Sequence, residues 1–393
     1  MTSIDPKTLR ANWNYPTAVR FGPGRIAELP DACRARGMTR PLLVTDPGLA
    51  KLPLVGETVA INVEAGLPTA VFFDIKANPV GRNVEDGVAA YRRHKADGVV
   101  AFGGGSALDV AKAIALMVGQ TRPLWDFEDR DDWYTRVNVA GMAPCVAVPT
   151  TSGTGSEVGR VSVITDESTH TKKLIFHARM QPAIVIDDPA LTLGLPASIT
   201  AATGMDALSH NLEAYCAPGF HPMADGIALE GMRLIRAWLP TAVADGRNLA
   251  ARAYMMAAST MGATAFQKGL GAMHALSHPI GANFDTHHGR TNAVVMPYVL
   301  LFNRPAIEDK LTALARYLGL ANPSGKSVID WVLELRRTVG IEHTLKDLGV
   351  GPEHAERIAA EAIKDPSAPT NPVPLDVGKL ASLFRNAAEG VLA

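Results

Sequence analysis

GVVAFGGGSALDVAKAIAL, residues 98–116, is the stretch that decides the fold of the first half of the chain. An uninterrupted apolar run leads into three glycines, and a helical pattern of small and apolar residues follows. A strand that is apolar on both faces is typical of a parallel sheet covered by helices. Ser106 is a natural cap for the helix, and Asp109 three residues later would complete a capping box. The glycines are Gly103, Gly104 and Gly105.

A glycine-rich turn before a helix is also a candidate phosphate site. The free N–H groups and the positive end of the helix dipole suit a pyrophosphate, and glycines let the backbone approach it. The run is not the GxGxxG fingerprint, and it is equally compatible with a plain tight turn. A second loop, PTTSGTGSEV (149–158), follows another apolar strand and offers hydroxyls to a cofactor. Its hydroxyl candidates are Thr150, Thr151 and Thr154.

Asp46 ends the earlier apolar strand PLLVTD (41–46). A carboxylate at the end of such a strand can bind the ribose diol of adenosine and would repel a 2′-phosphate, so this position favours NAD over NADP. The alternative is a turn-initiating aspartate, because Pro47 and Gly48 follow it.

The surrounding sequence predicts two domains. Strand-like and helix-like segments alternate up to AIVIDD (183–188), which indicates a parallel α/β sheet with right-handed crossovers. From Pro196 onward the chain has helical periodicity and no further clear strand. We therefore expect an α/β Rossmann-like NAD-binding domain over 1–194 and an all-helical metal-binding domain over 195–393. A Pro-rich stretch, DPSAPTNPVP (365–374), is the one low-complexity segment.

The helical half contains a histidine-rich stretch, GLGAMHALSHPIGANFDTHHG (269–289), with four of the eleven histidines. His274 and His278 are four residues apart and share one helical face. We expect this helix to end at Pro279 and Gly281, so that His287 and His288 return from a loop. Upstream, Asp206 and His210 form a second pair at helical spacing.

These two pairs and a loop histidine can supply a carboxylate and imidazoles to one divalent cation with a position left open for substrate. Each pair taken alone is equally at home as a hydrogen-bonded couple in a core. Taken jointly, with no cysteine cluster to suggest a closed structural zinc site, they favour an open Asp/His metal site.

Composition narrows the classes of protein. The 38 basic and 39 acidic residues give a formal net charge of −1, which provides no electrostatic case for nucleic acid or an anionic membrane as partner. The three cysteines are too few for a disulfide framework and fit a reducing cytoplasm. We find no signal peptide and no apolar run long enough for a membrane span, and expect a cytoplasmic protein.

Taken together, these motifs resemble the iron-containing, or group III, alcohol dehydrogenase family. The resemblance covers most of the chain and is carried by FGPG, VTD, GGGSALDVAKA, PTTSGTGSEV, DPALT, GMDALSH and the HALSHP…HHG block, in the family's order. It implies a dehydroquinate synthase-like architecture, with the active site between the two domains. It also implies an oxidoreductase that transfers hydride between NAD and a small alcohol or aldehyde, with Fe(II) as metal and Zn(II) as the alternative.

The resemblance assigns roles by position. It places His278 near the nicotinamide as a non-ligand and possible proton relay, Lys172 at a ribose-binding position beside Lys173, and no role on His287. The metal ligands it implies are Asp206, His210, His274 and His288. The cofactor residues it implies are Asp46, Gly103, Gly104, Gly105, Ser106, Asp109, Thr150, Thr151, Thr154 and Lys172.

Several alternatives stay open at this point. A dehydroquinate synthase-like lyase, a polyol or hydroxy-acid dehydrogenase and a maleylacetate reductase-like enzyme share the same architecture, and a nucleotide-sensing protein with a vestigial site is a third class. Lys268 either faces the pocket and favours an anionic substrate or is a solvated surface lysine. We also expect a homo-oligomer, a dimer or higher, in which an edge strand from TAVRFG (17–22) pairs with its copy.

Overall fold

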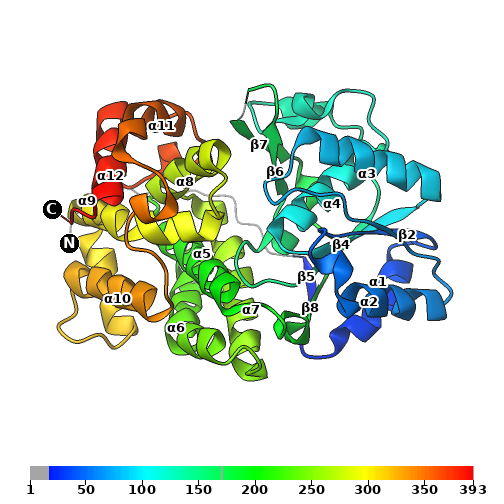
Figure 1. Cartoon of the computed structure of the whole chain (residues 1–393), viewed down its shortest axis with the longest axis horizontal. Coiled ribbons are helices and arrows are strands. Elements are labelled where there is room, and N and C mark those ends of the chain that lie inside the picture. The colour runs from blue at the N-terminus through cyan, green and yellow to red at the C-terminus, as the bar shows by residue number, and fades with distance from the viewer. Residues whose placement is uncertain (1–16, 170, 393) are drawn as a thin grey trace. The chain divides into compact units, whose positions relative to one another are not determined.

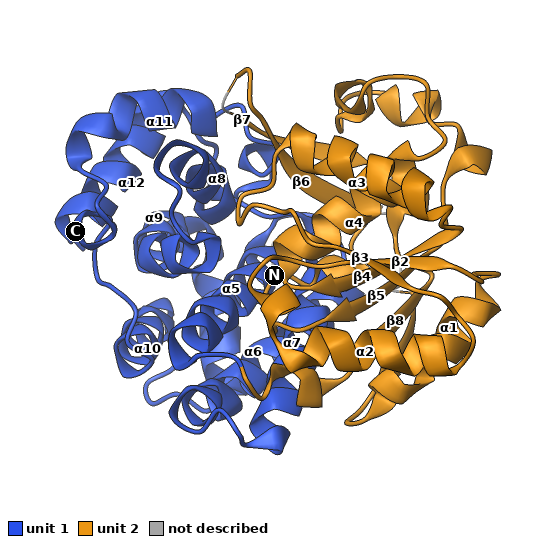
Figure 2. Ribbon diagram, turned by 45° about the vertical axis from the view of Figure 1, so that its right-hand side comes forward, with its two compact units in different colours: residues 1–15, 195–393 blue, residues 16–194 orange. Residues whose placement is uncertain are grey.

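The computed structural model describes residues 17–169 and 171–392, and Figure 1 colours the chain from blue at the N-terminus to red at the C-terminus. The chain divides after Gly194 into two compact units, which are coloured separately in Figure 2. No described helix is long and apolar enough to cross a membrane.

The N-terminal unit contains a six-stranded parallel sheet, which confirms the predicted fold class. Its strand order is β1-β8-β5-β4-β2-β3, so β1 is an edge strand. Every residue of β2, β4, β5 and β8 is buried, as expected for central strands covered on both faces. The strands are β1 Ala18–Phe21, β2 Pro41–Val44, β3 Ala70–Phe72, β4 Gly98–Gly103, β5 Cys145–Pro149 and β8 Ile184–Asp187.

Helices cover both faces of this sheet. In Figure 2, α3 (Gly81–His94) and α4 (Gly105–Met117) lie on one face, and α1 (Leu29–Ala35) and α2 (Pro53–Glu64) lie on the other. The chain adds β3 on one side of β2 and then places β4 on the other side, so the strand order reverses between β2 and β4. Ligands of open α/β sheets bind outside the carboxyl ends of the strands at such a switch point.

A two-stranded antiparallel ribbon was not predicted from the sequence. It consists of β6 (Val161–Asp166) and β7 (Thr171–Phe176), paired in register from Val161 with Phe176 to Asp166 with Thr171. The sequence of β7 lacks the alternation of apolar and polar residues that marks a half-buried strand, and only one of its residues is buried. Pairing with β6, and not a hydrophobic face, stabilises this strand.

The C-terminal unit is helical throughout its described residues. Helix α5 is buried on all sides from Thr200 to Cys216 and packs against α6, α7 and α9, so it forms the centre of the core. The helices are α5 Ala197–Cys216, α6 Pro222–Ala244, α7 Leu249–Ala265, α8 Ala272–Phe284, α9 His288–Tyr317, α10 Gly325–Thr338, α11 Ala355–Ala362 and α12 Val377–Glu389. Short 3-10 turns such as η10 (Phe266–Lys268) connect them.

The expected end of the histidine helix at Pro279 and Gly281 was wrong. Helix α8 continues through both residues to Phe284, because this stretch is packed and buried and the tertiary contacts outweigh the cost of proline. The chain leaves the helix at Asp285, whose left-handed φ of 54° is tolerated by aspartate. His288 therefore begins the next helix, α9, and does not lie in a loop.

Candidate metal centre and cofactor site

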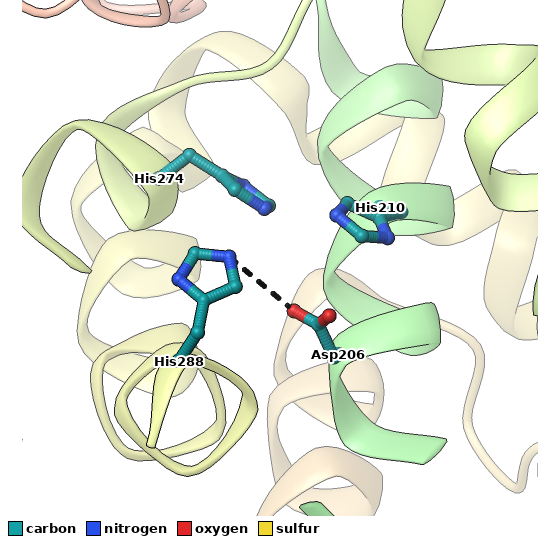
Figure 3. Close-up of side chains that lie close together, drawn as sticks. All are labelled: Asp206, His210, His274 and His288. Atoms are coloured by element: carbon teal, nitrogen blue, oxygen red, sulfur yellow. Dashed lines mark ion pairs between the residues drawn. The ribbon is translucent and has the colours of Figure 1, made fainter. Parts of the chain in front are cut away.

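The candidate metal centre is built from three helices of the C-terminal unit. Asp206 and His210 are one turn apart on α5 and both are buried. His274 comes from the first turn of α8 and His288 is the first residue of α9. In Figure 3 the four side chains point toward one another from these helices.

The four side chains form a compact donor set. One ligand atom from each of the four residues can be chosen so that all lie within 4.8 Å of one another. His288 Nε2 is 3.7 Å from Asp206 Oδ1, the pair joined by the dashed line in Figure 3. Tetrahedral ligands at about 2.1 Å from a cation are separated by about 3.4 Å, so modest closure of the cluster would complete the site. Three imidazoles and one carboxylate suit Fe(II) and Zn(II).

Glu213, which the sequence reading did not single out, holds His274 in place. Its Oε2 accepts a hydrogen bond of 2.6 Å from His274 Nδ1, and both side chains are buried. Burial alone would lower the pKa of His274, but the bond to Glu213 and the nearby carboxylate charges outweigh it and raise that pKa. The more basic imidazole then presents Nε2 to the cluster, as in many carboxylate–histidine–metal sites.

Two glycines before α8 allow this arrangement. A Cβ at Gly271 would lie 2.9 Å from Glu213 Oε1 and 2.8 Å from Asn371 Oδ1, and one at Gly269 would lie 2.6 Å from the Thr370 Cβ. Asn371 Oδ1 accepts from the backbone N–H of Ala272 at the start of the helix. The Pro-rich segment is thus a packed support for the histidine helix, not a low-complexity linker.

His278 lies beside the cluster and not in it. Its ring stacks on that of His288 with 5.3 Å between the ring centroids, and its Nδ1 is 2.7 Å from Asp365 Oδ2. Burial would raise the pKa of Asp365, but the charge and hydrogen bond of His278 lower it overall. His287 is the cap residue before α9 and accepts the backbone N–H of Thr291 through its carbonyl oxygen.

In the N-terminal unit, the glycine turn and the threonine loop lie together at the carboxyl ends of β4 and β5. Thr150 donates its backbone N–H to the Gly103 carbonyl at 3.0 Å. A Cβ at Gly105 would lie 2.6 Å from Thr154 Cγ2, and one at Gly104 would lie 3.4 Å from Thr151 Cγ2. The Ser152 hydroxyl of the same loop is buried without a hydrogen-bond partner among the described residues, a donor and acceptor that a bound cofactor can satisfy.

Asp46 belongs to the same edge of the sheet. A Cβ at Gly103, which has a φ of +144°, would lie 3.6 Å from Asp46 Oδ2. The other oxygen, Oδ1, accepts the backbone N–H groups of Gly48 and Leu49 at 2.8 and 3.0 Å. The turn and the ligand interpretations are therefore compatible, because they use different oxygens of one carboxylate.

The predicted capping by Ser106 and Asp109 was wrong. Helix α4 begins at Gly105 with Gly104 as its cap, and the Ser106 hydroxyl donates to the Ala77 carbonyl. The Asp109 carboxylate accepts from Ser156 Oγ at 2.5 Å, from the Val163 N–H at 2.9 Å and lies 3.2 Å from Lys112 Nζ. It therefore joins α4 to the threonine loop and to β6.

The two adjacent lysines of β7 separate onto opposite faces of the ribbon. Lys173 forms an ion pair of 2.7 Å with Asp166 and lies 5.2 Å from the Trp125 ring centroid. Lys172 pairs in register with Thr165 and lies on the other face. Lys173 therefore forms contacts within its own unit, and the ribose-binding role of Lys172 stays a prediction.

Lys268 is not a solvated surface lysine, so that expectation was wrong. Its side chain is buried, forms an ion pair with Asp225 and donates to the Tyr215 carbonyl at 3.1 Å. Burial lowers its pKa to about 8, although Asp225 opposes this shift. The ammonium group thus neutralises Asp225 and satisfies a carbonyl at the end of α5. A role of Lys268 toward an anionic substrate stays a prediction.

Sequence reasoning missed Glu213, Asn292 and Asp365, all of which lie against the cluster. The spacing of Glu213 could have revealed it. Glu213 lies seven residues after Asp206 and three after His210, which places all three on one face of a helix. Asn292 likewise follows His288 by four residues. Asp365 is 87 residues from its partner His278 in the sequence and carried no local signal.

Comparison with known proteins agrees with this geometry. Residues 16–189 match the family described as Iron-containing alcohol dehydrogenase, and residues 200–388 match the C-terminal domain of the Fe-containing alcohol dehydrogenase family. The chain is 40% identical over 370 residues to the 4-hydroxybutyrate dehydrogenase of Cupriavidus necator, which covers 91% of this chain and 94% of that enzyme. It is 37% identical over 382 residues to the 1,3-propanediol dehydrogenase of Klebsiella pneumoniae, covering 95% and 97%.

Solved structures lead to the same result. A crystal structure of 1,3-propanediol oxidoreductase superposes with a TM-score of 0.91 at 37% identity, covering 96% of this chain and 100% of that chain. The sulfoacetaldehyde reductase of Bifidobacterium kashiwanohense in complex with NAD+ gives 0.87 at 29% identity, covering 98% and 100%. The fold and these matches define an oxidoreductase acting on CH–OH groups. The chain belongs to the iron-containing alcohol dehydrogenase family.

Proposed function

We propose that this chain catalyses reversible, NAD-dependent hydride transfer between C4 of the nicotinamide and a small primary alcohol or its aldehyde, with Fe(II) as the resident metal and Zn(II) as the alternative. The observation that carries the proposal is the buried donor set of Asp206, His210, His274 and His288, in a chain of this family. A vestigial site would not be expected to retain all four donors together with the buried Glu213 support.

The metal-site residues would share the work as follows. The four donors hold the cation, and Glu213 fixes the His274 ring by its 2.6 Å hydrogen bond. A divalent cation in this position acts as a Lewis acid, which lowers the pKa of an alcohol hydroxyl and polarises a carbonyl. His278, held by Asp365, is placed to pass a proton from the site, because an imidazole exchanges protons near neutral pH.

The cofactor residues would act through the N-terminal unit. The backbone N–H groups at the start of α4 receive the pyrophosphate, and the small size of the glycine turn keeps that approach open. Thr150, Thr151 and Thr154 would offer hydroxyls beside it, and Asp46, whose Oδ2 lies beside the glycine turn, would bind the ribose. A carboxylate there disfavours the 2′-phosphate of NADP.

The choice of substrate follows from the relatives. One is named for 4-hydroxybutyrate and another for 1,3-propanediol, which are short primary alcohols with a second oxygen function at the far end. We therefore place succinate semialdehyde and 3-hydroxypropanal at the head of the test panel, with simple aliphatic aldehydes as the comparison.

The test is anaerobic reconstitution. Protein stripped with a chelator is loaded with Fe(II) or with Zn(II), and NADH consumption is followed across the panel. We expect no turnover without metal, turnover with at least one metal, and NADH consumed in equal amount to alcohol formed. Binding of metal and NADH with no net consumption of NADH on any aldehyde would overturn the proposal in favour of a lyase-like use of the fold.

A further inference from the structure

Asn292 lies against the candidate metal centre. It follows His288 by one turn of α9 and its side chain is fully buried. Its Nδ2 is 2.9 Å from Asp206 Oδ1, 3.2 Å from His274 Nε2 and 3.1 Å from His288 Nε2. One amide nitrogen therefore contacts three of the four residues that form the donor set.

A bound cation would change this arrangement. An amide NH2 has two hydrogens, so it cannot donate to all three atoms at once. The Nε2 atom of each histidine has one lone pair, which a divalent cation also needs, whereas the Asp206 carboxylate has lone pairs for both. Once a cation takes the histidine nitrogens, the NH2 group keeps only its contact with Asp206, and its positive hydrogens face a positive charge.

The oxygen of the same amide lacks a hydrogen-bond donor. Asn292 Oδ1 is buried and has no hydrogen-bond partner among the described residues. A buried carbonyl oxygen without a partner costs free energy, and such a group in a native structure calls for a missing donor or ion. Rotation of the terminal amide by half a turn exchanges the two ends without moving the rest of the side chain.

We propose that Asn292 is a fifth residue of the metal centre: its NH2 group holds the ligands together when no cation is present, and its oxygen turns toward the cation when one is bound. This inference rests on the proposed metal site. Asn292 is a positioning residue without a cation and an oxygen contact of the cation once one is bound. The rotation gives the buried amide oxygen a partner and moves the NH2 group away from the positive charge, to the position that the oxygen leaves.

Two substitutions separate the two ends of the amide. Asn292→Leu keeps the approximate shape and removes both polar ends. Asn292→Asp keeps an inward oxygen, adds a negative charge and removes the NH2 donor. Dissociation constants for Co(II) and Zn(II) are measured at pH 7.5 against a competing chelator, and the visible absorption of the Co(II) protein reports its coordination.

The two variants are expected to move metal affinity in opposite directions. Asn292→Leu should weaken Co(II) and Zn(II) binding by roughly 10- to 100-fold, the range seen when groups that support metal ligands are removed. Asn292→Asp should bind both metals at least as tightly as the original chain, with a changed Co(II) spectrum. Both variants should lower the melting temperature of metal-free protein, because each loses the NH2 contacts.

Asn62→Leu is the matched control. Asn62 is also fully buried, and its Oδ1 has no hydrogen-bond partner in the part of the chain that the structure describes, but it lies on α2 in the N-terminal unit. This variant should lower the melting temperature and leave metal affinity unchanged, which separates loss of a buried amide from loss of this amide. Far-UV circular dichroism of every variant verifies folding before metal is titrated.

The outcomes are distinct. Three results would overturn the inference, because each would show that the amide oxygen has no role toward the cation. Both variants at Asn292 could bind metal like the original chain, or both could shift the metal affinity in the same direction. In the third result, Asn292→Leu binds metal more tightly than the original chain. If the original chain binds no divalent cation, the proposed function fails with it. An original chain that binds metal and reduces aldehydes, with unaffected variants, defeats only the role of Asn292.

Discussion

Glu213 joins the histidine of one helix to the backbone that starts it: Oε2 accepts from His274 Nδ1 at 2.6 Å, and Oε1 accepts from the Met273 N–H at 2.8 Å. A single buried carboxylate thereby sets both the ring orientation and the first turn of α8. These two hydrogen bonds explain how one ring of a candidate metal site built from three helices is held in a defined direction.

Glu213→Gln is expected to weaken metal binding and turnover by at least about 10-fold, because a glutamine has one acceptor oxygen where two donors must be satisfied. Metal affinity by chelator competition is the primary measurement, with steady-state turnover as the second. Glu334→Gln, at an exposed position of α10, is the control and should change neither. Normal affinity in Glu213→Gln would show that the ring is held without this carboxylate.

His274 and His278 should behave differently although they lie one turn apart. His274→Ala should lose metal and activity together, whereas His278→Ala should retain metal and turn over more slowly. Asp365→Asn should resemble His278→Ala in weaker form, because an asparagine oxygen can still accept the 2.7 Å bond but without the negative charge that strengthens it. Metal content by elemental analysis and steady-state turnover are measured for both histidine variants. A His274→Ala protein that contains metal and remains active would refute the assignment of His274 as a ligand.

Gly105→Ala should weaken NADH binding by about 10-fold or more. The new Cβ would lie 2.6 Å from Thr154 Cγ2, so the threonine loop must move away from the start of α4. Adding Thr154→Ser removes that methyl group and should restore part of the affinity in a fluorescence titration. No recovery in the double variant would indicate that the added methyl obstructs the cofactor directly and not the loop.

Asp166 supplies a pH-dependent part of the stability of the N-terminal unit. Burial would raise its pKa, but Lys173 and Ser168 hold it well below its ordinary value. The unfolded state thus binds a proton more readily, and the stabilisation present above about pH 4 is lost as the pH falls. The difference in melting temperature between the original chain and Asp166→Asn should shrink from pH 6 to pH 3. A constant difference would contradict this account.

The three cysteines should be inert in the folded protein. Cys33, Cys145 and Cys216 are buried and unpaired, and burial raises the pKa of each to about 12. Thiolate is the reactive form, so a thiol reagent at pH 8 should label none of them rapidly, and all three after unfolding in guanidinium. Rapid labelling of native protein would show that one of these sites opens readily.

Local periodicity was enough to predict much of the architecture. Apolar runs ending in Asp46 and in Gly103 indicated buried parallel strands, and residues that recur every three or four positions indicated the helices after Pro196. Spacing of four also paired Asp206 with His210. The β6–β7 ribbon was not predicted, because its two strands are stabilised by pairing with each other. The continuation of α8 beyond Pro279 was not predicted either, because tertiary packing outweighed the tendency of proline to end a helix.

The sequence by itself determined most of the helices, the buried strands of the parallel sheet and which side chains share a face, because these properties act over one or two turns of chain. Only the tertiary structure decided which faces meet. It brought Asp365 to His278 across 87 residues, buried Lys268 against Asp225 and placed the Asn292 amide among three candidate ligands. Contacts between distant segments depend on the packing of the whole unit, and no local pattern of residues contains that information.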